Sequence, residues 1–307
     1  MPGPNFGEHY KEAGIPFLRL NKESWSEYRL SLDPSVPALS VAIGSNHYTV
    51  TQSLRSVWFR QPVFLRNTPA QALSPEEQLE RSQWSAFLRA LAVFDVAKWM
   101  NSPQAVYLAE CKPYQLMVAK RCGLSIPTTR VGNSSSDLRM KFSGPVIIKS
   151  LDTVLLREAE DCLFTYTTVV DSRILTDEIV KAAPLLVQEY FSQKTDCRIT
   201  FVGSRVFAVR ILSGGAPIEG DWRKTPKELL EYEDFVLPQA VEEQCKNLMQ
   251  SLGLAFGAID MLETPEGYIF LEVNPTGEWG WLCRRERMID HAIRDWLMRP
   301  PGRTSPA

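Results

Sequence analysis

Two apolar segments near the C-terminus of this chain are spaced as the strands of a hairpin, and they carry side chains with oxygen atoms that could bind a ligand. Residues 256–263 and 268–273 read as strands, and the turn at 264–267 makes them a hairpin. Glu272 and Asn274 are two residues apart and therefore point to the same side of the second strand, where Asp260 faces them across the hairpin. Three oxygen ligands are thus expected to converge at one edge.

Such a set of oxygen donors is typical of a magnesium site. Mg²⁺ is a hard cation that prefers oxygen ligands and is commonly bound beside substrate phosphates. The alternative is that Asp260 and Glu272 are solvated at strand ends, with Asn274 and Pro275 forming a turn. Three such residues flanked by apolar strands favour the metal site, with Asp260, Glu272 and Asn274 as its ligands.

Cationic side chains in other predicted strands are candidates for contact with phosphate. Lys149 ends the apolar run 146–148, which projects a cation into a cleft, although a surface lysine that extends its ammonium into water is the alternative. Asp196 and Arg198 share one face of a strand, and Arg210 lies on its antiparallel neighbour. Arginine suits two-pronged contact with phosphate during transfer, whereas a cross-strand Asp–Arg pair is the structural alternative.

A further segment has the pattern of a nucleotide-reading strand, while the common nucleotide motifs are absent. Gln188, Glu189 and Tyr190 follow an apolar run at 185–187, where an extended backbone offers a donor and an acceptor to adenine. The sequence has no GxxxxGK[ST] loop, no GxGxxG, no GxSxG and no HExxH. Nucleotide use therefore requires a different scaffold.

Composition narrows the class of protein further. The net charge of −2 over 307 residues argues against a broad nucleic-acid footprint, and no apolar run approaches the roughly 20 residues that span a bilayer. The six cysteines form no CxxC pair and the three histidines lie far apart, so we expect neither a zinc framework nor a disulfide ladder. Reduced thiols in a cytoplasmic enzyme are the simplest interpretation. The charge and the short apolar runs predict neither nucleic acid nor membrane as a partner.

The pattern of elements indicates an α+β fold built from subdomains around a cleft. We expect strands at 15–20, 38–42, 48–52, 56–59, 146–150, 185–190, 197–202 and 205–212. We expect helices at 6–13, 74–100, 112–122, 176–183, 240–252 and 280–298.

Taken in order along the chain, these residues resemble the ATP-grasp superfamily across roughly residues 105–290. The matching positions are Lys112, Lys149, Gln188-Glu189, Asp196-x-Arg198, Arg210, Asp260 and Glu272-x-Asn274-Pro275. Other segments resemble the microviridin-type ligases, or graspetide synthetases. These are Val57-Trp58-Phe59-Arg60-Gln61-Pro62, Trp99-Met100-Asn101-Ser102-Pro103, Lys112-Pro113-x-Gln115-Leu116, Ile126-Pro127-x-Thr129, Asp221-Trp222-Arg223 and Asn274-Pro275-x-Gly277-Glu278-Trp279.

The resemblance implies an ATP-grasp fold of three domains and a role for each matching residue. It implies an N-terminal pre-ATP-grasp domain at 1–105, a central lid at 106–186 and a catalytic domain at 187–307, with ATP between the last two. The implied cofactor-binding residues are Lys112, Lys149, Gln188, Glu189, Tyr190 and Asp196. Arg198 and Arg210 would stabilise the transferred phosphoryl group, Mg²⁺ would lie on Asp260, Glu272 and Asn274, and Arg223 and Arg60 would face the substrate.

The reaction implied by the resemblance is ATP-dependent crosslinking of a ribosomal precursor peptide. An Asp or Glu side chain is phosphorylated, and a Ser or Thr hydroxyl or a Lys amine then displaces phosphate, which closes a macrocycle. A leader sequence provides recognition, and the resemblance also implies a homodimer. One alternative is an ATP-grasp ligase that adds an amino acid to a peptide or protein. Another is a binding regulator without catalysis, which the intact set of Asp260, Glu272, Asn274 and Arg210 disfavours.

The chain departs from the graspetide pattern at three places. Gln61 stands where the family has a second arginine, so the role of that arginine is not expected here. The family usually opens with an apolar strand, whereas the helix-like segment 6–13 comes directly after the first five residues. The lid segment 151–163 contains no glycine, so a glycine-rich phosphate flap is not expected.

Overall fold

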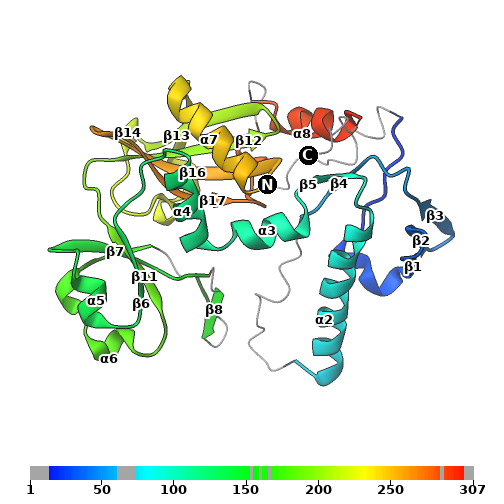
Figure 1. Ribbon diagram of the computed structural model, residues 1–307, viewed down its shortest axis with the longest axis horizontal. Helices are drawn as coiled ribbons and strands as arrows, with labels where there is room; N and C mark the ends of the chain where they lie inside the picture. The colour runs from blue at the N-terminus through cyan, green and yellow to red at the C-terminus, as the bar shows by residue number, and fades with distance from the viewer. Residues whose placement is uncertain are drawn as a thin grey trace. The chain divides into compact units, whose positions relative to one another are not determined.

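The computed structural model describes residues 14–60, 73–152, 155–158, 161–164, 167–283 and 287–300. The chain divides into two compact units (Figure 1). The first comprises residues 1–64, 74–103 and 278–307, and the second comprises residues 65–73 and 104–277. The expected helix at 6–13, and with it the question of a first strand, lies outside the described residues, as does Gln61.

The first unit contains an antiparallel three-stranded sheet and a short parallel pair, β4–β5. Leu39 and Val41 project from the sheet into a small core with Phe94 and Ala97. The unit's elements are η1 (Lys22–Glu27), β1 (Arg29–Asp33), β2 (Ala38–Ile43), β3 (Asn46–Val50), β4 (Ser56–Trp58), α2 (Pro75–Ala90), η2 (Leu91–Val93), β5 (Lys98–Met100), η6 (Gly280–Leu282) and α8 (Ile289–Met298).

Helix α2 begins where the sequence predicts and ends earlier. Ser74 and Glu77 form a reciprocal capping box, and Pro75 opens the first turn. The expected extension to residue 100 is wrong, because Phe94 leaves helical geometry at φ −81° and ψ 58° and residues 98–100 pair with β4 instead. The helical spacing of apolar residues continues into the segment that forms β5. There the tertiary contacts of the strand outweigh the local preference for a helix.

Two other expectations in this unit need correction. The expected strand at 15–20 is wrong, because Leu18 and Leu20 pack against the small core without pairing to any strand. The expected helix at 280–298 begins only at Ile289, because Cys283 is extended at φ −69° and ψ 115° after a single 3-10 turn. The hairpin of β2 and β3 and the strand β4 are confirmed.

The second unit is organised around a six-stranded sheet in the order β14–β13–β12–β16–β17, with β15 also paired to β13. All of its ladders are antiparallel. Its strands are β12 (Thr195–Val202), β13 (Arg205–Ser213), β14 (Ala216–Pro217), β15 (Leu230–Asp234), β16 (Phe256–Thr264) and β17 (Gly267–Asn274).

Helices cover one face of this sheet, and the other face carries both apolar residues and the polar residues of the candidate site. Cys197, Ile199 and Phe201 alternate along β12 into the main core, with α4 (Lys112–Arg121) and α7 (Gln239–Ser251) packed on them (Figure 1). The residues that alternate with these along β12, including Asp196 and Arg198, therefore point to the other face of the sheet. The unit also contains α3 (Pro103–Ala109), η4 (Trp222–Lys224) and η5 (Lys227–Leu229).

A second, four-stranded sheet of this unit has the order β10–β7–β11–β6. Leu138, Val146, Leu175, Val180 and Val187 form its own core, beneath two short helices. Its elements are β6 (Thr129–Gly132), α5 (Ser135–Arg139), β7 (Pro145–Lys149), β10 (Thr168–Asp171), η3 (Ser172–Ile174), α6 (Asp177–Val180) and β11 (Leu185–Glu189), with the separate hairpin β8 (Leu155–Glu158) and β9 (Asp161–Phe164). No described helix combines the length and apolar character that crossing a membrane requires.

Candidate active site

The hairpin of β16 and β17 brings the three predicted oxygen ligands together. Asp260 pairs directly with Glu272, and Asn274 pairs with Ala258 one step further along the same face. A register shift follows Asp260, which is a β-bulge at the point where the carboxylates meet. The amide nitrogen of Asn274 donates to Oδ2 of Asp260 at 3.3 Å, so the expected convergence is present.

Arg198 lies beside this hairpin on β12, in register with Asp260. Its Nη1 donates to Oδ1 of Asp260 at 2.7 Å, and both side chains are almost fully buried. Gly277 closes in from the following loop, where an added Cβ would stand 2.8 Å from the Cβ of Ala258 and 3.1 Å from Nη2 of Arg198. Only glycine permits the backbone to approach the arginine this closely.

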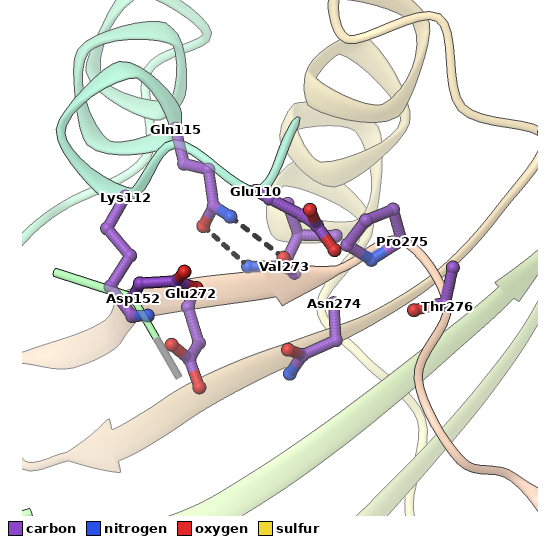
Figure 2. Close-up of a pocket in the computed structure, with 9 residues that line it drawn as sticks. All are labelled: Glu110, Lys112, Gln115, Asp152, Glu272, Val273, Asn274, Pro275 and Thr276. Carbon is purple, nitrogen blue, oxygen red and sulfur yellow. Dashed lines mark hydrogen bonds between the residues drawn. The ribbon is translucent and has the colours of Figure 1, made fainter. Parts of the chain in front are cut away.

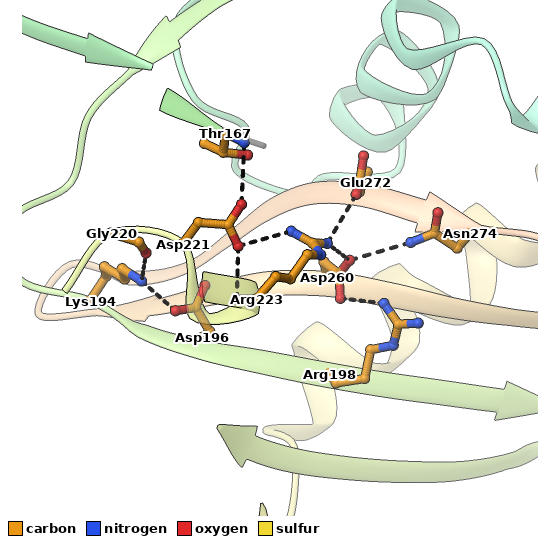
Figure 3. Close-up of polar contacts among 10 residues, drawn as sticks. All are labelled: Thr167, Lys194, Asp196, Arg198, Gly220, Asp221, Arg223, Asp260, Glu272 and Asn274. Atoms are coloured by element: carbon orange, nitrogen blue, oxygen red, sulfur yellow. Dashed lines mark hydrogen bonds and ion pairs between the residues drawn. The ribbon is translucent and has the colours of Figure 1, made fainter. Parts of the chain in front are cut away.

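Arg223 reaches the same carboxylates from the loop before β15, as Figure 3 shows. Its Nη2 lies 3.2 Å from Oδ2 of Asp260 and 3.5 Å from Oε1 of Glu272. Asp221 caps the turn by accepting from the Arg223 N–H at 3.1 Å and also accepts from the N–H of Thr167 at 3.2 Å. Burial opposes the arginine's charge, but the surrounding carboxylates raise the pKa of its guanidinium.

A buried lysine that the sequence did not single out supports this loop. Lys194 contacts the Asp196 carboxylate and donates to the carbonyl of Gly220 at 2.7 Å, which ties the strand to the loop (Figure 3). Burial raises the pKa of Asp196, although the nearby ammonium of Lys194 opposes the shift. Because Lys194 and Asp196 are two residues apart, their shared side of the chain was a usable signal.

Two lysines approach the carboxylates from other elements. Lys149, at the end of β7, is half-buried, and desolvation lowers the pKa of its ammonium, while the charges of Glu272 and Asp260 oppose that shift. Lys112 opens α4 and donates to the carbonyl of Leu151 at 3.2 Å. A polar cleft lies here (Figure 2), lined by Glu110, Lys112, Gln115, Asp152, Glu272, Val273, Asn274, Pro275 and Thr276.

The segment expected to read adenine is the end of β11. Gln188 is buried, and its Nε2 donates to Oγ1 of Thr129 at 3.1 Å. Glu189 is exposed and accepts from the backbone N–H of Thr128 at 3.1 Å, and Tyr190 follows the strand directly. Through the pairing of β11 with β7, Gln188 shares the sheet face that Lys149 occupies.

One predicted residue of the second unit, Arg210, points away from this cluster. Register places Arg210 opposite Cys197, on the helix-covered face, where its guanidinium binds Glu263 at 2.6 Å and Glu233 at 3.0 Å. Its expected contact with a transferred phosphoryl group therefore does not fit this arrangement. Arg60 belongs to the first unit and pairs with Glu278 at 2.8 Å.

The donor set fits Mg²⁺ on chemical grounds. Asp260 and Glu272 supply carboxylate oxygens and Asn274 an amide oxygen, the ligands that a hard cation prefers. The guanidinium of Arg223 lies close to both carboxylates, so the space between Asp260 and Glu272 favours a positively charged group. Among the described residues, no group of three or more His, Cys, Asp and Glu side chains is arranged to hold a metal, so the set depends on Asn274.

Solved structures with the same fold define the class of this protein. The macrocyclase MdnC from Microcystis aeruginosa MRC, bound with precursor peptide MdnA, is 25% identical with a TM-score of 0.78, covering 94% of this chain and 93% of its own. A RiPP-associated ATP-grasp ligase from Chryseobacterium gregarium, in complex with ADP and a leader and core peptide, is 24% identical with a TM-score of 0.77, covering 95% and 91%. The ATP-grasp ligase PsnB, complexed with a phosphomimetic variant of a minimal precursor, Mg and ADP, is 19% identical with a TM-score of 0.68, covering 95% and 92%.

The fold is therefore that of the ATP-grasp ligases, as the order of motifs predicts. Residues 111–293 match the sequence profile of the RimK-like ATP-grasp domain. The chain belongs to the RimK-like ATP-grasp family. No curated protein matches it by sequence.

Proposed function

We propose that this protein is an ATP- and Mg²⁺-dependent ligase that crosslinks side chains within a ribosomal precursor peptide. The observation that carries the proposal is the cluster of oxygen donors and arginine side chains on one face of the six-stranded sheet. Asp260, Glu272 and Asn274 supply oxygen donors, and Arg198 and Arg223 contact the same carboxylates. The likeness over most of the chain to a macrocyclase bound with its precursor peptide supports a peptide as the substrate.

In the proposed reaction, a carboxylate oxygen of a peptide Asp or Glu attacks the γ-phosphorus of ATP. The bond to the bridging oxygen breaks, which gives an acyl phosphate and ADP. A hydroxyl or amine of the same peptide then attacks the acyl carbon and loses its proton, while phosphate leaves. Each linkage thus removes one water from the peptide, and the chain's task is positioning and charge stabilisation.

Each polar group has a proposed role in this chemistry. Bound Mg²⁺ would supply positive charge at the phosphate oxygens, held by Asp260, Glu272 and Asn274. Lys112 and Lys149 would bind phosphates, with the end of β11 (Gln188 and Glu189) and the following Tyr190 at the adenine and Asp196 supporting the nucleotide side. We assign charge stabilisation of the transferred phosphoryl group to Arg198, because Arg210 lies on the opposite face.

The substrate side is proposed to include Arg223 and Arg60. Arg223 is 39% exposed beside the metal ligands, so its guanidinium can meet a peptide carboxylate entering the site. Arg60 is 35% exposed and stacks over Trp58 at 5.4 Å. A leader sequence outside the reacting core would provide recognition of the peptide.

The proposed domain organisation is an N-terminal domain at 1–105, a central lid at 106–186 and a catalytic domain at 187–307. A homodimer is proposed from the family resemblance alone. A cytoplasmic location is proposed because Cys111, Cys122, Cys197, Cys245 and Cys283 are free thiols.

The test is mass spectrometry of the purified protein incubated with ATP, Mg²⁺ and the short peptide encoded nearest its gene. We expect the peptide to lose one water mass per linkage, only when both ATP and Mg²⁺ are present. A gain of one amino-acid residue mass, with free amino acids supplied, would support the amino-acid-adding ligase instead. An unchanged peptide with no ADP released would overturn the proposal.

Matched variants of one hairpin separate the proposed site from general damage. Asp260→Asn and Glu272→Gln should abolish ADP release while the thermal unfolding transition persists. Glu263→Gln removes a carboxylate from the same strand as Asp260, on the helix-covered face, and should retain activity. ADP release at the wild-type rate by either of the first two variants would refute the metal assignment.

A further inference from the structure

Gln115 is a buried side chain that makes two hydrogen bonds to the backbone between two of the proposed metal ligands. It lies on α4, three residues after Lys112, and is 2% exposed. Its carboxamide oxygen accepts from the N–H of Val273 at 2.9 Å, and its nitrogen donates to the carbonyl of Val273 at 2.9 Å (Figure 2). The same nitrogen also donates to the carbonyl of Ala109. The amide's two N–H donors and its oxygen are therefore all engaged.

The position of Val273 makes this contact consequential. Val273 lies between Glu272 and Asn274 on β17, which is the end strand of the sheet. An end strand presents N–H and C=O groups that have no neighbouring strand. The bulge after Asp260 also interrupts the ladder on the other side of β17, directly beside Glu272. The amide of Gln115 takes the place that a further strand would occupy at this point.

We propose that Gln115 is a positioning residue that fixes the oxygen donors of Glu272 and Asn274 through the backbone between them. The inference rests on the proposed function, because it takes those two residues as Mg²⁺ ligands. Ligand distances in metal sites tolerate shifts of only about 0.2 Å, so freedom in the backbone at Val273 would spread both donors at once. Since Gln115 and Lys112 share one helix, the same contact sets the phosphate-facing lysine relative to the metal ligands.

The test compares the binding of Mn²⁺, used as a probe for Mg²⁺, in the presence of ADP by titration calorimetry. Gln115→Met has a similar size and removes all three hydrogen bonds. We expect its Mn²⁺ dissociation constant to rise by roughly 10- to 100-fold, the range seen when a residue that orients metal ligands is removed. The rate of ADP release should recover as Mg²⁺ is raised, which a general loss of folded protein would not produce.

Val118→Ala is the matched control, because Val118 is buried on the same helix and supports it only by packing. It should lower the unfolding temperature and leave Mn²⁺ affinity within about twofold of wild type, a shift well under the 1.4 kcal/mol of a tenfold change. If Gln115→Met shows no cooperative unfolding, Gln115→Glu is measured against the same expectation, because it keeps the size and loses the donors. Amide exchange on the wild type gives an independent reading, since the N–H of Val273 should be protected.

The outcomes distinguish this inference from the proposed function. Wild-type Mn²⁺ affinity in the folded Gln115 variant, equal weakening in Val118→Ala, or rapid exchange at Val273 would each overturn the positioning role alone. Failure of the wild-type protein to bind Mn²⁺ with ADP would instead overturn the metal role of Glu272 and Asn274, and the inference on Gln115 with it.

Discussion

At the scale of single residues, the site is organised around the shared carboxylate of Asp260. Arg198 donates to one of its oxygens, while Arg223 and Asn274 share the other. The convergence with Glu272 could be predicted from sequence, because strand alternation and a short turn fix which side chains face one another. Gln115 could not be assigned a role, because its partner Val273 is 158 residues away and no local pattern indicates the contact.

Arg210 shows how the register of two strands decides which sheet face a predicted residue occupies. The turn at Gly203 and Ser204 pairs Val202 with Arg205, and counting back along both strands pairs Arg198 with Val209. Arg210 must then point to the opposite face, because successive side chains alternate. The length of the turn was available in the sequence, so the register, rather than the residue type, was the missing step.

Replacing Arg223 should change metal affinity and peptide crosslinking in opposite directions. Arg223→Gln removes a cation that competes with Mg²⁺ for Asp260 and Glu272, so Mn²⁺ affinity without nucleotide should tighten by roughly tenfold, about 1.4 kcal/mol. Crosslinking of the peptide should fall at the same time, because the substrate carboxylate loses its partner. Calorimetry and mass spectrometry measure the two effects separately. Arg223→Lys, which keeps the charge, should leave Mn²⁺ affinity nearer wild type; weaker Mn²⁺ binding in Arg223→Gln would contradict the prediction.

At the scale of elements, boundaries with a local chemical signal are the ones that sequence predicts well. The start of α2 follows from the capping box of Ser74 and Glu77, and the end of α7 lies one residue before Leu252, close to the position expected from Gly253. The expected end of the helix at 74–100 and the expected start of the helix at 280–298 are wrong, because apolar residues continue through a change of structure. There the strand β5 and the extended Cys283 are set by tertiary packing.

The β16–β17 hairpin also has a pH-sensitive contact on its helix-covered face. The hydroxyl of Tyr268 donates to Glu263 at 2.9 Å, and burial, followed by that hydrogen bond, raises the pKa of Tyr268 to about 12. An unfolded tyrosine titrates near 10, so between about pH 10 and 12 the unfolded state binds fewer protons than the native state. The free energy of unfolding should therefore fall as pH rises through that window.

Denaturant unfolding at a series of alkaline pH values measures this slope. Tyr268→Phe has no phenolic proton and should lose the Tyr268 part of the pH dependence, although its stability near neutral pH is expected to be lower because Glu263 loses a donor. Lysine titration is common to both proteins, so the difference between the two curves is the relevant quantity. Parallel curves for wild type and Tyr268→Phe would show that the contact does not hold the phenolic proton.

At the scale of the whole molecule, the sequence predicts the fold through the order of its motifs. Lys112, Lys149, Asp196-x-Arg198 and Glu272-x-Asn274 lie on separate elements of the second unit, and their sequence order resembles that of the ATP-grasp superfamily. The assignment of the C-terminal segment 278–307 to the same unit as the N-terminal sheet could not be predicted. That grouping depends on long-range contacts, such as those of Arg55 and Ser56 with the last carbonyls of α8.

These two units lead to a prediction about how ligands stabilise the protein. A ligand that binds only the native state stabilises it by about 2.7 kcal/mol at 100 times its dissociation constant. Because the proposed nucleotide and metal ligands all lie in the second unit, ADP with Mg²⁺ should slow amide exchange there, most strongly along β16 and β17, and raise the unfolding temperature. Amide exchange resolved along the chain is the suitable measurement, since a chain of two units need not unfold in a single step. Glu272→Gln or a chelator should remove most of the effect; equal protection by ADP without a divalent cation would mean that the carboxylate pair plays no part in holding the nucleotide.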